Sequence, residues 1–164
     1  MGRRRFTRDR HGRYRPGLAV AERDLLRRLP SEAGELVEED EPDARRLFPV
    51  AYPGDPGAER EYRDMMGSHL LEHHRAALDT LVRTVDAPTL EEGDLQAWLG
   101  ALEVMRLVVG TRLDVSEDFT GIDRDHPDYD EHVVYQYLSL LQEEIVEALT
   151  AALPTPGTAT GDPP

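Results

Sequence analysis

Apolar residues recur along most of this chain at the three- and four-residue spacing of α-helices. Residues 18–29, about 58–86, 89–109 and 131–153 each place apolar side chains on one helical face. A proline follows each of the first two segments, and we expect it to end the helix. The pattern predicts a mainly α protein, a compact helical bundle of three to five helices.

Residue types at the segment ends sharpen these boundaries. Pro30 is expected to stop the first helix, and Ser31 to cap a further short turn. Thr89-Leu-Glu-Glu92 has the form of a capping box that opens the third helix. Gly110 stands where a left-handed C-cap would close that helix.

The first 17 residues form a basic arm with a different pattern. In "RRRFTRDRHGRYRPG", Phe6 and Tyr14 flank a turn that contains Gly12, which is typical of a short β-hairpin. We therefore divide the chain into an arm or hairpin at 1–17, a helical domain at 18–153 and a disordered tail at 154–164.

Charge separates the arm from the rest of the chain. The net charge is -14, yet residues 1–28 carry +7 and the remainder -21. Such an arm is suited to contact phosphates or an acidic partner, or to fold onto its own acidic body, and the sequence leaves both readings open. The candidate contact residues are Arg3, Arg4, Arg5, Arg8, Arg10 and Arg13.

An acidic, proline-broken connector is expected at about 38–57. Its apolar stretch "LFPVAY" is too hydrophobic for a free linker. We expect that stretch to dock on the body, with Phe48 and Tyr52 as anchors.

The stretch "SHLLEHHR" raises the question of a metal site. His69, Glu72 and His73 fit the pattern H-x-x-E-H and share one helical face. A hydrolytic zinc needs a third protein ligand and a substrate cleft, and nothing in the chain points to either. His69 and His73 stay weak metal candidates, and we expect no cofactor.

Motifs for catalysis are missing from the sequence. The chain has no Cys, no G-x-S-x-G, no P-loop and no G-x-G-x-x-G. It also has no run of 18 apolar residues and no apolar signal segment. We therefore expect a non-enzymatic, soluble, cytoplasmic protein that is not bound to a membrane.

Four residues of the third helix and one that follows it receive specific roles. Trp98 and Leu102 are predicted to be buried in the core, and Gly110 is predicted to cap the end of the helix. Arg106 is expected to pair with an acid of the last helix, Glu143 or Glu144. Arg112 is expected in the loop after the cap, where it is free to contact a partner.

Two stretches carry a family resemblance, "LFPVAYPGDPGAEREYR" (47–63) and "WLGALEVMRLVVGTRLDVSED" (98–118). They resemble an actinobacterial family, formerly a domain of unknown function, often encoded beside the proteolytic adaptor ClpS and now named for the oxidative-stress regulator AosR. The likeness covers most of residues 3–150. At 103–105 this chain has Glu-Val-Met, where the family has something closer to Asn-Asp-Leu.

The resemblance implies a regulator whose namesake senses oxidant through a cysteine pair, which this chain lacks. One hypothesis is a transcription-associated regulator that acts through DNA or the transcription machinery. The alternative is a protein-interaction or adaptor module with no nucleic-acid role, linked to regulated proteolysis. A protein partner is expected under both hypotheses, and a homodimer is compatible with the sequence.

Overall fold

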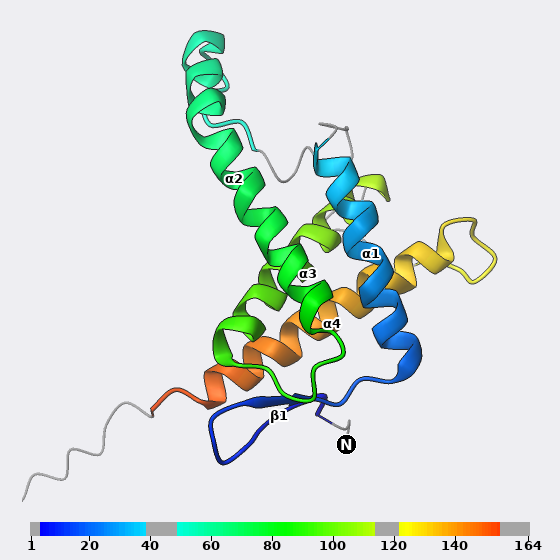
Figure 1. The fold of residues 1–164 in the computed structure, drawn as a ribbon. Coiled ribbons are helices and arrows are strands. Elements are labelled where there is room, and N and C mark those ends of the chain that lie inside the picture. The colour runs from blue at the N-terminus through cyan, green and yellow to red at the C-terminus, as the bar shows by residue number, and fades with distance from the viewer. Residues whose placement is uncertain (1–3, 39–48, 114–121, 155–164) are drawn as a thin grey trace, which may run out of the picture.

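The computed structural model describes residues 4–38, 49–113 and 122–154. Within them a two-stranded hairpin precedes four helices (Figure 1). The strands are β1 (Phe6–Arg8) and β2 (Tyr14–Pro16), and the helices are α1 (Val20–Glu38), α2 (Pro56–Thr84), α3 (Glu92–Arg112) and α4 (Tyr129–Ala151). The predicted mainly α bundle with an N-terminal hairpin is confirmed.

The hairpin is tied to the bundle through a backbone bridge. Its antiparallel strands pair Thr7 with Arg15 at their centre. On the other side of β2, Tyr14 and Leu90 exchange two backbone hydrogen bonds of 2.8 and 2.7 Å. Leu90 lies in the connection between α2 and α3, so this connection extends the small sheet by one bridge.

Helix α1 corrects the first predicted boundary. Pro30 does not end the helix but lies inside it and is buried. An internal proline removes one backbone hydrogen bond and costs about 3 kcal/mol or more. Leu26 before it and Ala33 after it are both buried in the core, and this packing on either side offsets the cost. Val20, an apolar residue of the predicted 18–29 segment, is exposed.

Helix α2 is 29 residues long, which corresponds to about 43 Å at 1.5 Å per residue. Asp55 caps its start by accepting hydrogen bonds from Gly57 and Ala58, and Pro56 occupies the first turn. The buried residues of α2 begin only at Ala77. Figure 1 shows that the preceding part projects away from the other helices.

Helix α3 corrects two further boundaries. Its capping box is formed by Glu91 and Asp94, two residues later than predicted. Gly110 is not a left-handed cap, because the helix continues through it to Arg112 and ends on right-handed Leu113. Gly110 is buried inside the helix.

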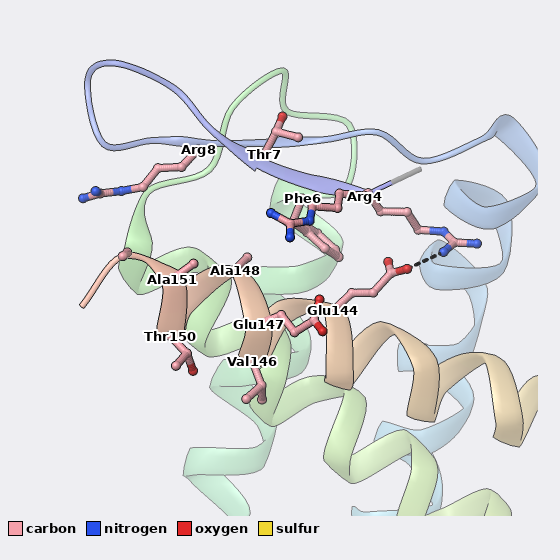
Figure 2. Close-up of a pocket in the computed structure, with 12 residues that line it drawn as sticks. Arg4, Phe6, Thr7, Arg8, Glu144, Val146, Glu147, Ala148, Thr150 and Ala151 are labelled. Atoms are coloured by element: carbon pink, nitrogen blue, oxygen red, sulfur yellow. Dashed lines mark hydrogen bonds and ion pairs between the residues drawn. The ribbon is translucent and has the colours of Figure 1, made fainter. Parts of the chain in front are cut away.

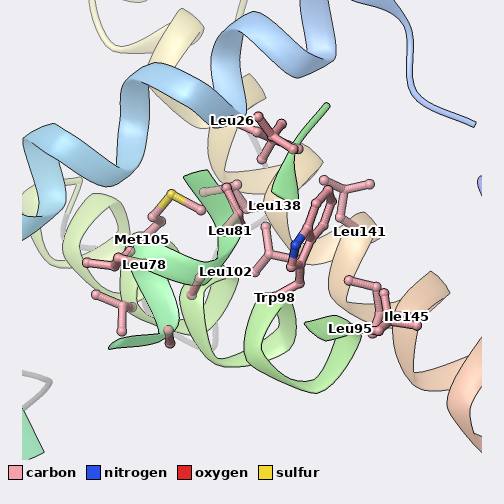
Figure 3. Close-up of a cluster of buried hydrophobic side chains, with 14 of the residues drawn as sticks. Leu26, Leu78, Leu81, Leu95, Trp98, Leu102, Met105, Leu138, Leu141 and Ile145 are labelled. Carbon is pink, nitrogen blue, oxygen red and sulfur yellow. The ribbon is translucent and has the colours of Figure 1, made fainter. Parts of the chain in front are cut away.

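The core gathers side chains from all four helices around Trp98 (Figure 3). The indole Nε1 of Trp98 donates a 2.7 Å hydrogen bond to Thr84 Oγ1, so its one polar group is satisfied. Phe6 of β1 packs edge-on against the Trp98 ring at a centroid distance of 6.2 Å. The fully buried core residues include Leu26, Leu81, Leu95, Leu102, Leu138, Leu141 and Ile145.

The predicted connector and tail lie partly beyond the part of the chain that the structure describes. Phe48 and residues 155–164 fall outside it. Tyr52 is described, and it is not a core anchor: it is 49% exposed and packs edge-on against Tyr62 of α2. Among the described residues, no helix is long and apolar enough to cross a membrane.

Candidate functional site

The turn of the basic hairpin is held by its own residues. Gly12 adopts a φ of 82°, a conformation that glycine takes without a side-chain penalty. The Asp9 carboxylate accepts hydrogen bonds of 2.8 and 3.0 Å from the backbone N–H groups of His11 and Arg13. Arg13 Nε also lies 3.5 Å from Asp9 Oδ2. Arg13 is therefore part of the turn.

Arg5 links the hairpin to two helices of the bundle. Its Nε donates a 2.8 Å hydrogen bond to Glu22 of α1, and a terminal nitrogen donates one of the same length to Glu144 of α4. The guanidinium also lies over the ring of Tyr137, 6.0 Å from its centroid. Glu22 Oε2 in turn accepts a 2.7 Å hydrogen bond from the Ala19 backbone. One arginine of the arm is thus paired within the molecule.

The pKa values in this cluster follow from burial and charge. Partial burial raises the pKa of the Glu22 carboxyl, but the hydrogen bonds from Ala19 and Arg5 outweigh it and hold the pKa below its usual value. Burial, followed by the negative charge of Glu22, raises the pKa of the Tyr137 hydroxyl above its ordinary value. The Glu22 carboxylate therefore stays ionised beside the permanent cation of Arg5 at neutral pH.

A second anchor of the hairpin comes from α1. Arg23 donates hydrogen bonds to the backbone carbonyls of Pro16 at the end of β2 and Val85 at the end of α2. This residue was not predicted from the sequence, and neither were Glu22 and Tyr137. The contacts of Arg23, the Arg5–Glu22 pair and the Arg5–Tyr137 contact join positions from 7 to more than 100 residues apart, and no local pattern marks such pairs.

The other described arginines of the candidate set are exposed to solvent. Arg4, Arg8 and Arg10 are exposed, and Arg10 Nε contacts the neighbouring His11 ring at 3.0 Å. Arg3 lies outside the described residues. The structure therefore divides the described part of the predicted set into one anchor, Arg5, one turn residue, Arg13, and three exposed cations.

A groove runs between the hairpin and the C-terminal part of α4 (Figure 2). Its volume is about 810 Å³. Residues 4–8 form one wall, and the other wall is formed by Glu144, Val146, Glu147, Ala148, Thr150, Ala151 and Ala152. In Figure 2, Phe6 extends from β1 toward the bundle, whereas Thr7 points away from α4. The groove thus combines a helix surface of apolar and polar side chains with cationic strand residues.

The arginines of α3 have different partners from those predicted. Arg106 does not pair with α4 acids; it forms a 3.1 Å ion pair with Glu103, one turn earlier on its own helix. Its guanidinium also lies 6.0 Å from the Tyr135 ring centroid. Arg112 is not in a loop, because it is the last residue of α3 and lies 3.7 Å from Glu131 of α4.

The histidine pattern does not converge with other ligand residues. His69 and His73 are both exposed on α2, in the part that precedes its buried residues. His74 is half-buried, and its ring centroid is 6.2 Å from that of His73. Among the described residues, no group of three or more His, Asp or Glu side chains is placed to hold a metal ion.

Comparisons with known proteins point to one family. The model of a family described as a domain of unknown function, DUF2017, matches residues 3–149. A protein of Mycobacterium leprae (strain TN) with the name "Putative oxidative stress regulator AosR" is 29% identical over 138 residues. That match covers 73% of this chain and 64% of the relative's length. No solved structure matches the chain.

Proposed function

Since the chain belongs to the DUF2017 family, and one relative bears the name of an oxidative stress regulator, we propose that it is a non-enzymatic regulatory protein with a transcription-associated role. It acts by binding, and its contact surface is the cationic hairpin. Because the chain has no Cys, thiol oxidation in this chain is not part of the proposed role.

The observation that carries this proposal is that one hairpin arginine is paired with the bundle while others stay exposed. Arg5 fixes the hairpin to α1 and α4, while Arg4, Arg8 and Arg10 stay exposed. A cationic surface held in one conformation loses less entropy on binding than a flexible arm would. The acidic remainder of the chain repels a polyanion, so that such a partner approaches from the hairpin side.

Transcript levels in the native host test the role. The gene is deleted, and the strain is complemented with the wild type or with Arg4→Gln/Arg8→Gln/Arg10→Gln. A matched control, Arg60→Gln/Arg83→Gln/Arg124→Gln, removes the same charge from exposed positions elsewhere. We expect the wild type and the control to restore the transcript profile and the hairpin variant to fail.

Two results would contradict the proposal, the first as a whole and the second in part. One is a deletion strain whose transcripts are unchanged with and without oxidant. The other is full complementation by the hairpin variant, which would leave the regulatory role but remove the hairpin from it.

A mobility-shift experiment with duplex DNA then distinguishes DNA from protein as the immediate target. A shift that weakens with salt and is lost in the hairpin variant identifies DNA as the target. Transcript changes that depend on the hairpin, without such a shift, identify a protein of the transcription machinery.

An adaptor role without nucleic acid is the second candidate, and the groove between β1 and α4 favours it. A groove beside a strand is a common place for a peptide segment to bind. Changed protein half-lives with unchanged messenger levels in the deletion strain would indicate this role.

A further inference from the structure

Strand β1 has a backbone edge with no partner among the described residues. Gly17 N–H donates to Arg5 C=O at 2.6 Å, and Asp9 N–H donates to Arg13 C=O at 2.7 Å. Hydrogen-bonded pairs alternate along an antiparallel ladder, so Thr7 is the residue between them that bonds to β2. The N–H and C=O groups of Phe6 and Arg8 therefore point away from β2.

The opposite side of the sheet is already occupied. Tyr14, which faces Arg8 across the strands, directs its own N–H and C=O to Leu90. A further strand cannot pair there without displacing that bridge. Within the described residues, the sheet can grow at β1 alone.

The groove against α4 lies along this open side. It follows residues 4–8, a length of about 17 Å in extended conformation, which matches a strand of about five residues. Val146, Ala148 and Ala151 supply apolar contacts on the helix side. An exposed strand edge beside a partly apolar wall has the form that domains use to bind extended peptides.

Charge decides which peptide fits. Arg5 is already paired with Glu22 and Glu144, so it adds no uncompensated charge to the groove. Arg4 and Arg8 line the groove, are exposed and have no carboxylate partner among the described residues. Against these two cations stands one exposed carboxylate, Glu147. Acidic side chains that a bound peptide directs toward Arg4 and Arg8 would complement the charge of these arginines.

We propose that the groove between β1 and α4 binds an extended acidic segment of a partner protein, which pairs with β1 as an added strand. The backbone of Phe6 and Arg8 supplies the hydrogen bonds, and Arg4 and Arg8 select for acidic side chains. This inference deepens the proposed function and rests on it for the identity of the partner as a regulatory target.

The test uses the full chain and a fluorescein-labelled peptide of seven residues in which glutamate alternates with valine. Fluorescence polarisation is expected to show saturable binding. A lysine–valine peptide of the same length is expected to bind at least about tenfold more weakly, because it meets Arg4 and Arg8 with like charge. A glutamate–valine peptide with N-methyl groups on alternate amides, made in both registers, is expected to bind weakly in one register only.

Substitutions at Arg8 separate charge from strand pairing. Arg8→Gln removes the cation and keeps the N–H group, whereas Arg8→Pro removes both. Because the Arg8 N–H points away from β2, proline there leaves the hairpin ladder intact. We expect Arg8→Pro to bind about threefold to tenfold more weakly than Arg8→Gln, the value of one hydrogen bond.

Arg15→Gln is the matched control. Arg15 is exposed on the same hairpin, but it lies on β2 and does not line the groove. Its removal is expected to leave peptide affinity unchanged. Trp98 fluorescence reports whether each variant keeps the wild-type core.

Three outcomes overturn the inference. The first is that the glutamate–valine peptide shows no saturable binding. The second is that folded Arg8→Pro and Arg8→Gln bind the peptide with equal affinity. The third is that Arg15→Gln loses as much peptide affinity as Arg8→Gln does. Duplex DNA could also displace the peptide, with Arg8→Pro binding DNA and peptide as tightly as Arg8→Gln does. In that case the surface binds phosphate charge and does not pair with a peptide strand.

The proposed function and the groove assignment can be contradicted independently of each other. Unchanged transcripts in the deletion strain, together with peptide binding in solution, would leave the groove assignment in place. Transcript levels that depend on the hairpin, without peptide binding in solution, would support the regulatory role and contradict the assignment of the groove as a peptide site.

Discussion

The hairpin and the first half of α2 lie at opposite ends of the molecule (Figure 1), and they reverse the usual relation between length and burial. Each hairpin strand has three residues, yet Phe6 is 4% and Tyr14 0% exposed. Helix α2 has 29 residues, and its early apolar side chain Met65 is 74% exposed. A short hairpin alone is marginal in water, so its order comes from the bundle.

The comparison separates two sources of structure. The N-terminal half of α2 is helical because its capping and its length satisfy the backbone locally. The hairpin is held by contacts with distant residues, namely Trp98, Leu90, Glu22 and Glu144. Loss of a distant contact should therefore weaken the hairpin strongly, whereas substitution on the projecting helix should change little.

The largest effect is expected for Phe6→Ala. Phe6 is buried against the edge of Trp98, and removal of a core phenylalanine costs about 3–5 kcal/mol. Urea denaturation followed by Trp98 fluorescence measures the free energy of unfolding. Thr7→Ala, an exposed neighbour on the same strand, serves as control and should change it by less than about 0.5 kcal/mol. A Phe6→Ala cost as small as that of Thr7→Ala would mean that the hairpin is not part of the cooperative fold.

The next effect is expected for Arg5→Gln. Its removal leaves the partly buried carboxylates of Glu22 and Glu144 without their cation, and we expect a loss of about 1–2 kcal/mol. Arg27→Gln is the comparison, because Arg27 pairs with Asp24 and Asp86 at the exposed surface. It should cost less than Arg5→Gln, since exposed ion pairs contribute little. The reverse order in denaturation experiments would contradict the anchoring role of Arg5.

A smaller effect is expected from pH through Glu22. Its pKa is lower in the folded chain than the ordinary value of 4.5. The stabilisation is therefore complete above that value and is lost as the pH falls through the lower, folded pKa. Unfolding free energies measured between about pH 6 and about pH 3 should fall more steeply for the wild type than for Glu22→Gln. Parallel curves would show that Glu22 is not stabilised by Arg5 and Ala19.

The smallest effect is expected for Met65→Ser on the projecting half of α2. Met65 is exposed, so the free energy of unfolding should change by less than about 0.5 kcal/mol. Amide hydrogen exchange should be faster in residues 57–70 than in residues 77–84, which pack on the core. Slow exchange across 57–70 would indicate that a second copy or another partner covers this half in solution.

The order of the elements followed from apolar spacing, and so did the positions of Trp98 and Leu102. The boundaries of α1 and α3 did not. Pro30 and Gly110 are strong helix breakers as isolated residues, but both are buried inside helices where packing outweighs their local preference. Local rules thus described the segments but failed where the core decides the boundary.

The candidate site was foreseen only in its residue types. Phe6 and Tyr14 on either side of the Gly12 turn marked the hairpin, yet this pattern did not distinguish the anchor Arg5 from the exposed cations. That distinction depends on Glu22 and Glu144, which lie 17 and 139 positions from Arg5. Several acids were available at comparable spacing, and no local signal selects these two.

The contact between Arg5 and Glu144 also constrains how the chain can fold during synthesis. The hairpin leaves the ribosome before the helices that hold it. Its backbone bridge needs Leu90, and Arg5 needs Glu144 as its second carboxylate partner. At about 5–20 residues per second, the interval between translation of the hairpin and of α4 is on the order of ten seconds. These distant contacts give the hairpin a high contact order. Its docking is therefore one of the last events of co-translational folding, and a chain cut before α4 would carry the basic arm without its final anchor.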